Sequence, residues 1–138
     1  MARIPNYLGL PLMAAAGYGA LYWFANRAVY FPFSYPQGEW YMQAALNAED
    51  AWMETADGVK LHAWWIGCPA SKLATLFLHG NAGNITHRGT HAREIVAAGS
   101  SLLLVDYRGY GKSAGRPTEA GLYADAEAGY AHLLSRGY

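Results

Sequence analysis

The stretch Thr75-Leu-Phe-Leu-His-Gly-Asn-Ala-Gly-Asn84 decides the fold of this 138-residue chain. It begins as a continuous apolar run, as expected for a strand buried on both faces, and changes to glycine and asparagine where the backbone has to turn. We therefore predict a short strand over Leu73–His79 that leads into a loop. A helix is predicted to follow over Ile85–Ala98, with Asn84 as its N-cap and Gly99 just past its end.

The neighbouring elements define the fold class. Two strand-like runs, Trp52–Ala56 and Val59–Ile66, precede the first stretch, and Asp57-Gly58 between them predicts a two-residue hairpin turn. A second apolar strand is predicted over Ser101–Asp106, followed by a helix over 118–135 that Thr118 caps. The order hairpin, strand, helix, strand, helix implies right-handed crossovers and an α/β fold, in which a parallel sheet extends from an antiparallel hairpin.

The N-terminal residues differ from the rest in composition. Tyr7–Ala25 contains no charged residue, and with its neighbours it reaches the roughly 20 residues that a membrane-spanning helix needs. We predict a hydrophobic anchor at 1–30, a linker at 31–50 and an α/β domain at 51–138. A cleaved signal peptide and a buried or surface-lying helix are alternatives, because prolines and glycines interrupt the segment and Ala14–Ala16 resembles a cleavage site.

Composition limits the partners and the compartment. Ten basic and ten acidic residues balance, so no nucleic-acid partner is predicted. Cys68 is the single cysteine and is predicted to be a packing residue, as His62 is predicted to be a strand residue. Arg3 and the amino terminus outweigh Arg27 across the anchor, which favours a domain outside the cytoplasm.

Two loops are the predicted location of any chemistry. Ligands of open parallel sheets bind beyond the carboxyl ends of the strands, here after His79 and after Asp106. Gly80 and Gly83 free the backbone of the first loop, so that amide hydrogens near Asn81 point into the cleft above the sheet. Such donors suit an oxyanion or a bound anion, and the alternative is a tight strand-to-helix turn without a ligand.

Two patterns resemble ligand sites, but their context argues against each. Gly111-Lys112-Ser113 matches the end of a phosphate-binding P-loop, but Asp106 occupies the position of the first required glycine, where a carboxylate would repel phosphate. His87, His91 and Glu94 have the spacing to share one helix face. Such pairs are common on solvated faces, so no metal is predicted.

A third pattern resembles a catalytic nucleophile. Gly111–Gly115 has the letters G-x-S-x-G of a nucleophile elbow, but loop residues separate it from the preceding strand. Asp125 and His132 lie about 10.5 Å apart along one predicted helix, too far for a catalytic triad. We therefore predict that Ser113 is a loop hydroxyl that stabilises its own turn, and that Asp125 and Glu127 belong to a solvated helix face.

Three ordered segments resemble the N-terminal half of an α/β-hydrolase. They are Glu54–Trp65, Leu78–Asn84 and Val105–Ser113, and together they are most similar to the BEM46-type membrane-anchored serine hydrolases. The resemblance implies hydrolysis of esters, thioesters or amides by a Ser-Asp-His triad, acting on a small acyl or peptide substrate without a cofactor or metal.

The resemblance also implies roles for individual residues. His79, Gly80 and Asn81 would form the oxyanion hole, with the backbone amide of Asn81 as a donor. The triad is expected beyond Tyr138, so this chain alone is predicted to be inactive. The other matched residues would form structural loops near the site: Gly83, Asn84, Asp106, Arg108 and Gly109.

The same resemblance predicts an open sheet edge. In the family's strand order, the strand that ends at His79 would be left as an apolar edge, which favours aggregation or pairing with another chain. Three hypotheses therefore stand: part of a serine hydrolase, a membrane-tethered non-enzymatic half-domain that binds a partner chain, and a phosphate-binding module.

Overall fold

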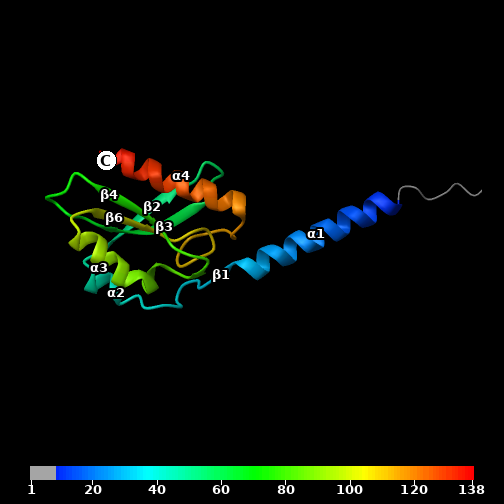
Figure 1. The fold of residues 1–138 in the computed structure, drawn as a ribbon, viewed down its shortest axis with the longest axis horizontal. Helices are drawn as coiled ribbons and strands as arrows, with labels where there is room; N and C mark the ends of the chain where they lie inside the picture. The colour runs from blue at the N-terminus through cyan, green and yellow to red at the C-terminus, as the bar shows by residue number, and fades with distance from the viewer. Residues whose placement is uncertain (1–8) are drawn as a thin grey trace, which may run out of the picture. The chain divides into compact units, whose positions relative to one another are not determined.

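A computed structural model describes residues 9–138 (Figure 1). The chain divides into two compact units, with the boundary between Tyr30 and Phe31.

Within residues 9–30, the first unit forms the helix α1, Gly9–Val29. α1 has 21 residues, but among residues 9–138 no helix combines the length and the apolar character needed to cross a membrane. Glycine, proline, tyrosine and asparagine interrupt its apolar residues. The described residues therefore do not support the spanning anchor predicted at 1–30. Arg3 and the amino terminus, on which the predicted placement outside the cytoplasm rests, lie outside the described residues.

The second unit is built on a mixed four-stranded sheet with the order β2-β3-β6-β4 (Figure 1). β2 (Glu49–Glu54) and β3 (Lys60–Ile66) form the antiparallel hairpin. β6 (Ser101–Val105) runs antiparallel to β3 and parallel to β4 (Ala74–Leu78). This arrangement confirms an α/β fold in which a parallel pair extends from an antiparallel hairpin.

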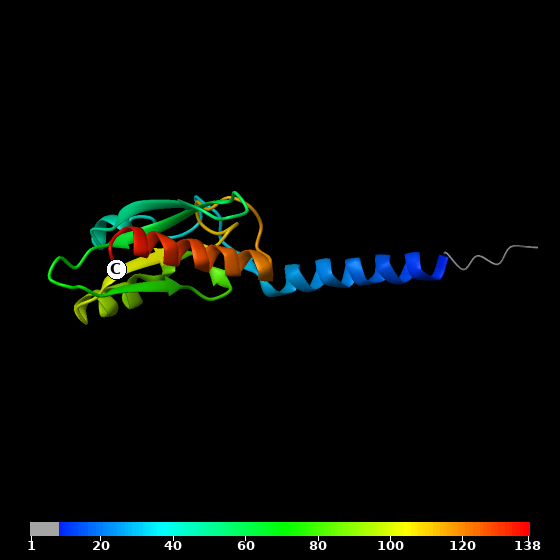
Figure 2. The same cartoon turned by 90° about the horizontal axis from the view of Figure 1, so that it is seen from above.

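The central strands supply two cores, one on each face of the sheet. Leu102 and Leu104 of β6 pack toward α3 (Gly89–Ala97), and the alternating Leu103 and Val105 pack toward α4 (Glu119–Ser135). Figure 2, seen from the α4 side, shows α4 in front of the sheet and running lengthwise along it. Because β6 contributes to both cores, all five of its residues are buried.

The predicted helix boundaries are largely confirmed. The Asn84 side chain accepts a hydrogen bond from the Thr86 amide, but the first turn is the separate 3-10 helix η1, Ile85–Arg88, which precedes α3. Gly99 follows α3 with a φ of 89°. The Thr118 side chain caps α4 by accepting from the Gly121 amide at 3.1 Å.

Two local predictions are wrong. The Thr55 amide donates to the Val59 carbonyl at 3.0 Å, so the hairpin loop has three residues, and Gly58 supplies the left-handed conformation at its last position. β4 is half-buried and not buried on both faces, because it forms the edge of the sheet; Leu78 is 36% exposed.

The segment 31–50, predicted as a linker, is joined to the second unit. β1 (Phe31–Pro32) pairs in parallel with β5 (Ala82–Gly83), and the short helix α2 (Met42–Ala45) buries Met42 in the core on the α3 side. The sequence shows no period here because β1 is held by backbone hydrogen bonds, which leave no pattern of side chains.

We predict that Gly121→Ala destabilises the protein, although alanine normally favours a helix by about 1 kcal/mol. An added Cβ would lie 2.6 Å from Cδ of Arg108. Arg108 cannot move away, because its guanidinium binds Asp57 and Asp125. Overpacking of this kind costs about 1–3 kcal/mol. Denaturant unfolding should show a lower free energy of unfolding for Gly121→Ala than for wild type. Gly19→Ala in α1, where an added Cβ has no neighbour within 4 Å, should cause no such loss. Equal effects of the two substitutions would contradict the prediction.

Candidate functional site

Three segments meet at the carboxyl ends of β4 and β6: the strap (residues 31–37), the first loop (residues 79–84) and the second loop (residues 106–117). Phe33 of the strap connects the two loops. Its amide donates to the Gly83 carbonyl at 3.0 Å, and its carbonyl accepts from the Gly111 amide at 2.9 Å. The strap therefore fixes the two loops relative to each other.

His79 is the buried anchor of the first loop. Its side chain is inaccessible to solvent, and its Nδ1 lies 2.6 Å from the carbonyl oxygen of Gly80. Because a carbonyl oxygen can only accept, Nδ1 is the donor in this bond. The opposite nitrogen, Nε2, faces Oδ1 of Asp106 at 3.5 Å. The rings of Tyr107 and Tyr110 pack edge-on against the imidazole, each with a centroid distance of 5.1 Å.

The peptide between Gly80 and Asn81 is the exposed part of this loop. The carbonyl and N–H of a planar trans peptide point in opposite directions, so holding the Gly80 carbonyl fixes the direction of the Asn81 N–H. The next carbonyl, that of Asn81, accepts from the Phe31 amide at 2.9 Å and from the Tyr110 hydroxyl at 2.7 Å. Both peptide units that contain Asn81 are therefore held by hydrogen bonds.

Asp106 lies completely buried beneath the two loops. Its Oδ1 accepts from the Ile85 amide at 2.9 Å, and its Oδ2 faces Nδ1 of His62 at 3.6 Å. Burial opposes ionisation, but His62, His79 and the Ile85 amide together hold the pKa of the carboxyl below its ordinary value. Gly111 packs directly on this carboxylate, and a Cβ at that position would collide with it.

Ser113 has the structural role that its sequence context predicts. Its hydroxyl donates to the Asp106 carbonyl at 2.7 Å and accepts from the His62 amide at 2.9 Å. His132, the histidine that follows in sequence, instead accepts from Nε of Arg136 at 3.0 Å on an exposed part of α4. Both contacts of Ser113 are to backbone groups, so neither joins its hydroxyl to the side chain of a histidine or an acid.

The P-loop-like residues show no phosphate cradle. Nζ of Lys112 lies 3.3 Å from a carboxylate oxygen of Asp50 and 5.0 Å from the centre of the Trp40 ring. The lysine thus pairs with an acidic residue of β2, and the Asp106 carboxylate packs against the neighbouring Gly111.

Arg108 forms a clamp between three elements. Its backbone amide and Nε each donate to Asp125 of α4 at 2.8 Å, and both terminal nitrogens bind Asp57 of the hairpin loop, at 2.7 and 2.9 Å. Asp125 is fully buried, so its predicted place on a solvated face is wrong, whereas Glu127 is exposed. The hydrogen bonds from Arg108 compensate the buried carboxylate.

The remaining loop residues of the predicted site contact the strap. The Asn84 side chain donates to the carbonyls of Phe33 and Gln37, at 3.0 and 2.8 Å. The Gly109 carbonyl accepts from the Ser34 hydroxyl at 3.0 Å. The structure therefore brings the strap together with every loop segment that the sequence singles out.

The two histidines considered as metal ligands have other contacts. Nδ1 of His87 accepts from the Asn84 amide at 3.2 Å, and the His91 ring packs on Phe77. Across residues 9–138 no group of three or more histidine, cysteine or acidic side chains is placed to hold a metal ion.

His62 is the site residue that sequence reasoning misses. It is predicted as an ordinary strand residue, and it does lie in β3, but it is completely buried between Asp50 and Asp106. The available signal is a single ionisable side chain within an otherwise apolar strand interior.

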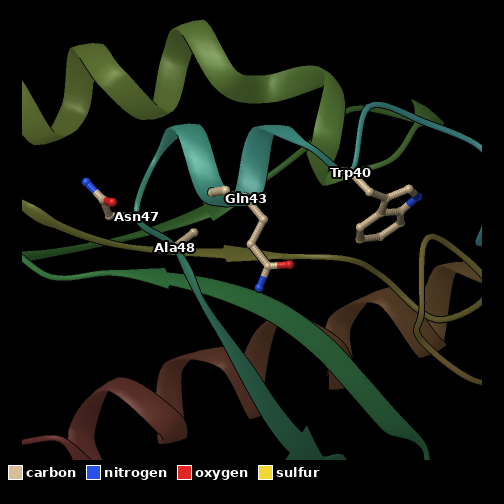
Figure 3. Close-up of a pocket in the computed structure, with 5 residues that line it drawn as sticks. Trp40, Gln43, Asn47 and Ala48 are labelled. Carbon is tan, nitrogen blue, oxygen red and sulfur yellow. The ribbon is translucent and has the colours of Figure 1, made fainter.

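A shallow hollow of about 460 Å³ lies beside α2 (Figure 3). Figure 3 shows Gln43 between Trp40 and Asn47. The Gln43 amide donates to Asp50 at 2.9 Å, so it is already bound within the protein. None of the residues that line the hollow belongs to the two loops: Trp40, Gln43, Ala44, Asn47 and Ala48.

Comparisons with known proteins identify the family. The chain is 37% identical over 141 residues to "Alpha/beta hydrolase domain-containing protein WAV2" of Arabidopsis thaliana, a match that covers 94% of the chain and 44% of that protein. It is 32% identical to "Protein bem46" of Schizosaccharomyces pombe, which covers 96% of the chain and 48% of the relative. No family model matches the chain.

Solved structures agree with these relatives. The Pyrococcus furiosus esterase Pf2001 has a TM-score of 0.63 at 29% identity, over 78% of this chain and 42% of the esterase. An α/β-hydrolase from Vibrio vulnificus has a TM-score of 0.61 at 25% identity, over 71% of this chain and 36% of the hydrolase. The chain therefore belongs to the α/β-hydrolase superfamily, and it spans less than half the length of these relatives.

We predict that the Arg108 clamp makes stability depend on pH through Asp57. The hydrogen bonds from Arg108 lower the pKa of Asp57 well below its ordinary 3.8, so the stabilisation is complete above that value and is lost as the pH falls further. Asp57→Asn should lower the thermal midpoint at pH 7, and the two proteins should converge at low pH. Glu127→Gln on exposed α4 is the matched control. A difference between wild type and Asp57→Asn that does not vary with pH would refute this prediction.

Proposed function

We propose that this chain provides the oxyanion-hole half of a serine hydrolase that cleaves esters, thioesters or amides. Membership of the α/β-hydrolase superfamily supports the reaction class. The side chains at the two loops form no triad, so we assign the Ser-Asp-His triad to sequence beyond Tyr138. The substrate would be a small acyl compound or a peptide.

The position of the Gly80–Asn81 peptide carries the proposal. It is exposed at the carboxyl end of β4, where ligands of parallel sheets bind, and His79 holds the carbonyl on its far side. Attack of a serine on an acyl carbonyl moves negative charge onto the carbonyl oxygen. In the proposed reaction the Asn81 N–H donates to that oxyanion, and the amide after the nucleophile supplies the second donor.

A chimera tests the role of Asn81. Residues 31–138 would replace the aligned segment of the Arabidopsis relative WAV2, and hydrolysis of p-nitrophenyl esters would be measured. Asn81→Pro removes the N–H and should lower kcat by about 10²–10³-fold, which is the typical cost of losing one oxyanion donor. Asn81→Ala keeps the amide and should retain most of the activity.

Thermal midpoints of both chimeras would show whether each variant is folded. Equal activity of folded Asn81→Pro and Asn81→Ala chimeras would disprove the assignment of the Asn81 amide. The 138-residue chain itself should not react with a fluorophosphonate probe, and labelling that disappears in Ser113→Ala would instead make Ser113 the nucleophile.

The open edge of β4 supports a second candidate function, a half-domain that binds a partner chain. β4 lies at the end of the sheet order, and its apolar residues are only half-buried. An edge strand presents unpaired backbone groups that favour pairing with another strand. In this alternative the chain has no catalytic role and forms a discrete oligomer.

Leu78→Lys tests the edge. A charge on an edge strand opposes strand pairing, so we expect the variant to weaken self-association of the chain at least about tenfold. Sedimentation velocity in mild detergent would measure this. Leu134→Lys on α4, where Leu134 is 53% exposed, controls for a general gain in solubility. A wild-type chain that is monomeric throughout would exclude pairing through this edge.

A further inference from the structure

Four ionisable side chains form a row across the sheet, in the order of its strands. Asp50 lies on β2, His62 on β3, Asp106 just after β6 and His79 just after β4. The separations are 2.7 Å from Asp50 Oδ1 to His62 Nε2, 3.6 Å from His62 Nδ1 to Asp106 Oδ2, and 3.5 Å from Asp106 Oδ1 to His79 Nε2. Acids and imidazoles thus alternate along the whole row.

The row is buried except at one end. The side chains of His62, Asp106 and His79 have no exposed surface, whereas Asp50 is 37% exposed. At that end Asp50 also contacts Gln43 and Lys112. The rings of Trp40 and Trp52 pack against His62, with centroid distances of 5.9 and 4.8 Å.

Several polar atoms of the row are buried without a hydrogen bond. They are His62 Nδ1, Asp106 Oδ2 and His79 Nε2. His62 Nδ1 faces Asp106 Oδ2, whereas His79 Nε2 faces Asp106 Oδ1, which already accepts from the Ile85 amide. Buried polar atoms left unpaired are costly, and the separations of 3.5 and 3.6 Å are only slightly longer than a hydrogen bond. Asp106 therefore lies between the two imidazoles, with one carboxylate oxygen facing the unpaired nitrogen of each ring.

The far end of the row reaches the exposed loop. His79 uses Nδ1 to hold the Gly80 carbonyl, so the orientation of its ring decides where that carbonyl points. Asp106 faces the other nitrogen of the same ring, and His62 faces the other oxygen of Asp106. A change at His62 is thereby transmitted through two side chains to the Gly80–Asn81 peptide.

We propose that His62 and Asp106 are positioning residues for the first loop: the buried row from Asp50 to His79 sets the direction of the Asn81 N–H. The role in catalysis rests on the proposed function, but the positioning of the loop does not. Neither residue touches substrate in this proposal, because both act through the His79 ring.

Two variants of the full 138-residue chain in mild detergent test the positioning. His62→Gln and Asp106→Asn should shift the ¹⁵N resonances of the His79 ring. They should also speed hydrogen exchange of the Phe31 amide, which donates to the Asn81 carbonyl, by about tenfold, the equivalent of one lost hydrogen bond. Exchange in β2 and β3 should change less. His91→Gln removes an imidazole outside the row and should leave both signals unchanged.

The outcomes separate positioning from general stability. If His62→Gln and Asp106→Asn are folded and leave the His79 resonances and the exchange of the Phe31 amide unchanged, the proposal is wrong. The same holds if exchange rises equally throughout the sheet. His62→Gln is the milder change, so it decides the matter if Asp106→Asn does not fold.

The WAV2 chimera distinguishes this inference from the proposed function. There His62→Gln should lower kcat by about tenfold with little change in KM, because the N–H it positions acts on the transition state. An inactive chimera whose Phe31 amide still responds in the exchange experiment would refute the proposed function alone. An active chimera in which neither kcat nor exchange of the Phe31 amide responds to His62→Gln would refute the positioning role alone.

Discussion

The buried carboxylate of Asp106 is the constraint on which the two loops depend. A fully buried charge is tolerated only when it is surrounded by hydrogen-bond donors and opposite charge. Here the surrounding groups come from different parts of the chain: the Ile85 amide, which begins η1, donates a hydrogen bond, while the imidazoles of His62 in β3 and of His79 after β4 face the carboxylate at 3.6 and 3.5 Å. Gly111 completes the enclosure, since any larger residue would displace the carboxylate. The groups that surround the Asp106 carboxylate therefore hold β3, β4, β6 and both loops together.

Arg108 is the positively charged counterpart of Asp106 in the second loop, because its guanidinium binds the carboxylates of Asp57 and Asp125. It lies two residues further along the second loop and compensates one buried carboxylate and one exposed carboxylate. Its contact with Asp125 holds the first half of α4, and its contact with Asp57 holds the hairpin loop. The second loop is therefore tied, close to its start, both to α4 and to the hairpin loop.

The sequence predicts the regular elements well, because their signals are local. Asn84, Thr118 and Gly99 mark helix ends through their own backbone chemistry, and the structure confirms each of them. Long-range contacts are not visible in the same way. Asp125 looks solvated until Arg108 is placed beside it, and its only signal is the small Gly121 four residues earlier, on the same helix face.

The candidate site likewise has parts that local sequence signals predict and parts that depend on long-range contacts. The first loop is predictable from its glycines and from the strand before it, as is the structural role of Ser113. The strap is not, since its contacts are made by backbone groups of residues 31–37 and leave no periodicity. His62 is missed for a related reason: a single histidine in a strand gives no indication that the sheet order will place two acids beside it.

The two candidate functions are linked by the geometry of the sheet. The carboxyl ends of parallel strands lie along one edge of a sheet, so a parallel strand added beside β4 would end next to the first loop. Under the proposed function, a residue just after that strand would reach the acyl carbon while the Asn81 N–H reaches its oxygen. Covering the open edge of β4 and completing the active site would then be a single event. Under the proposed function, the apolar edge of β4 and the Asn81 amide are therefore completed by the same added strand.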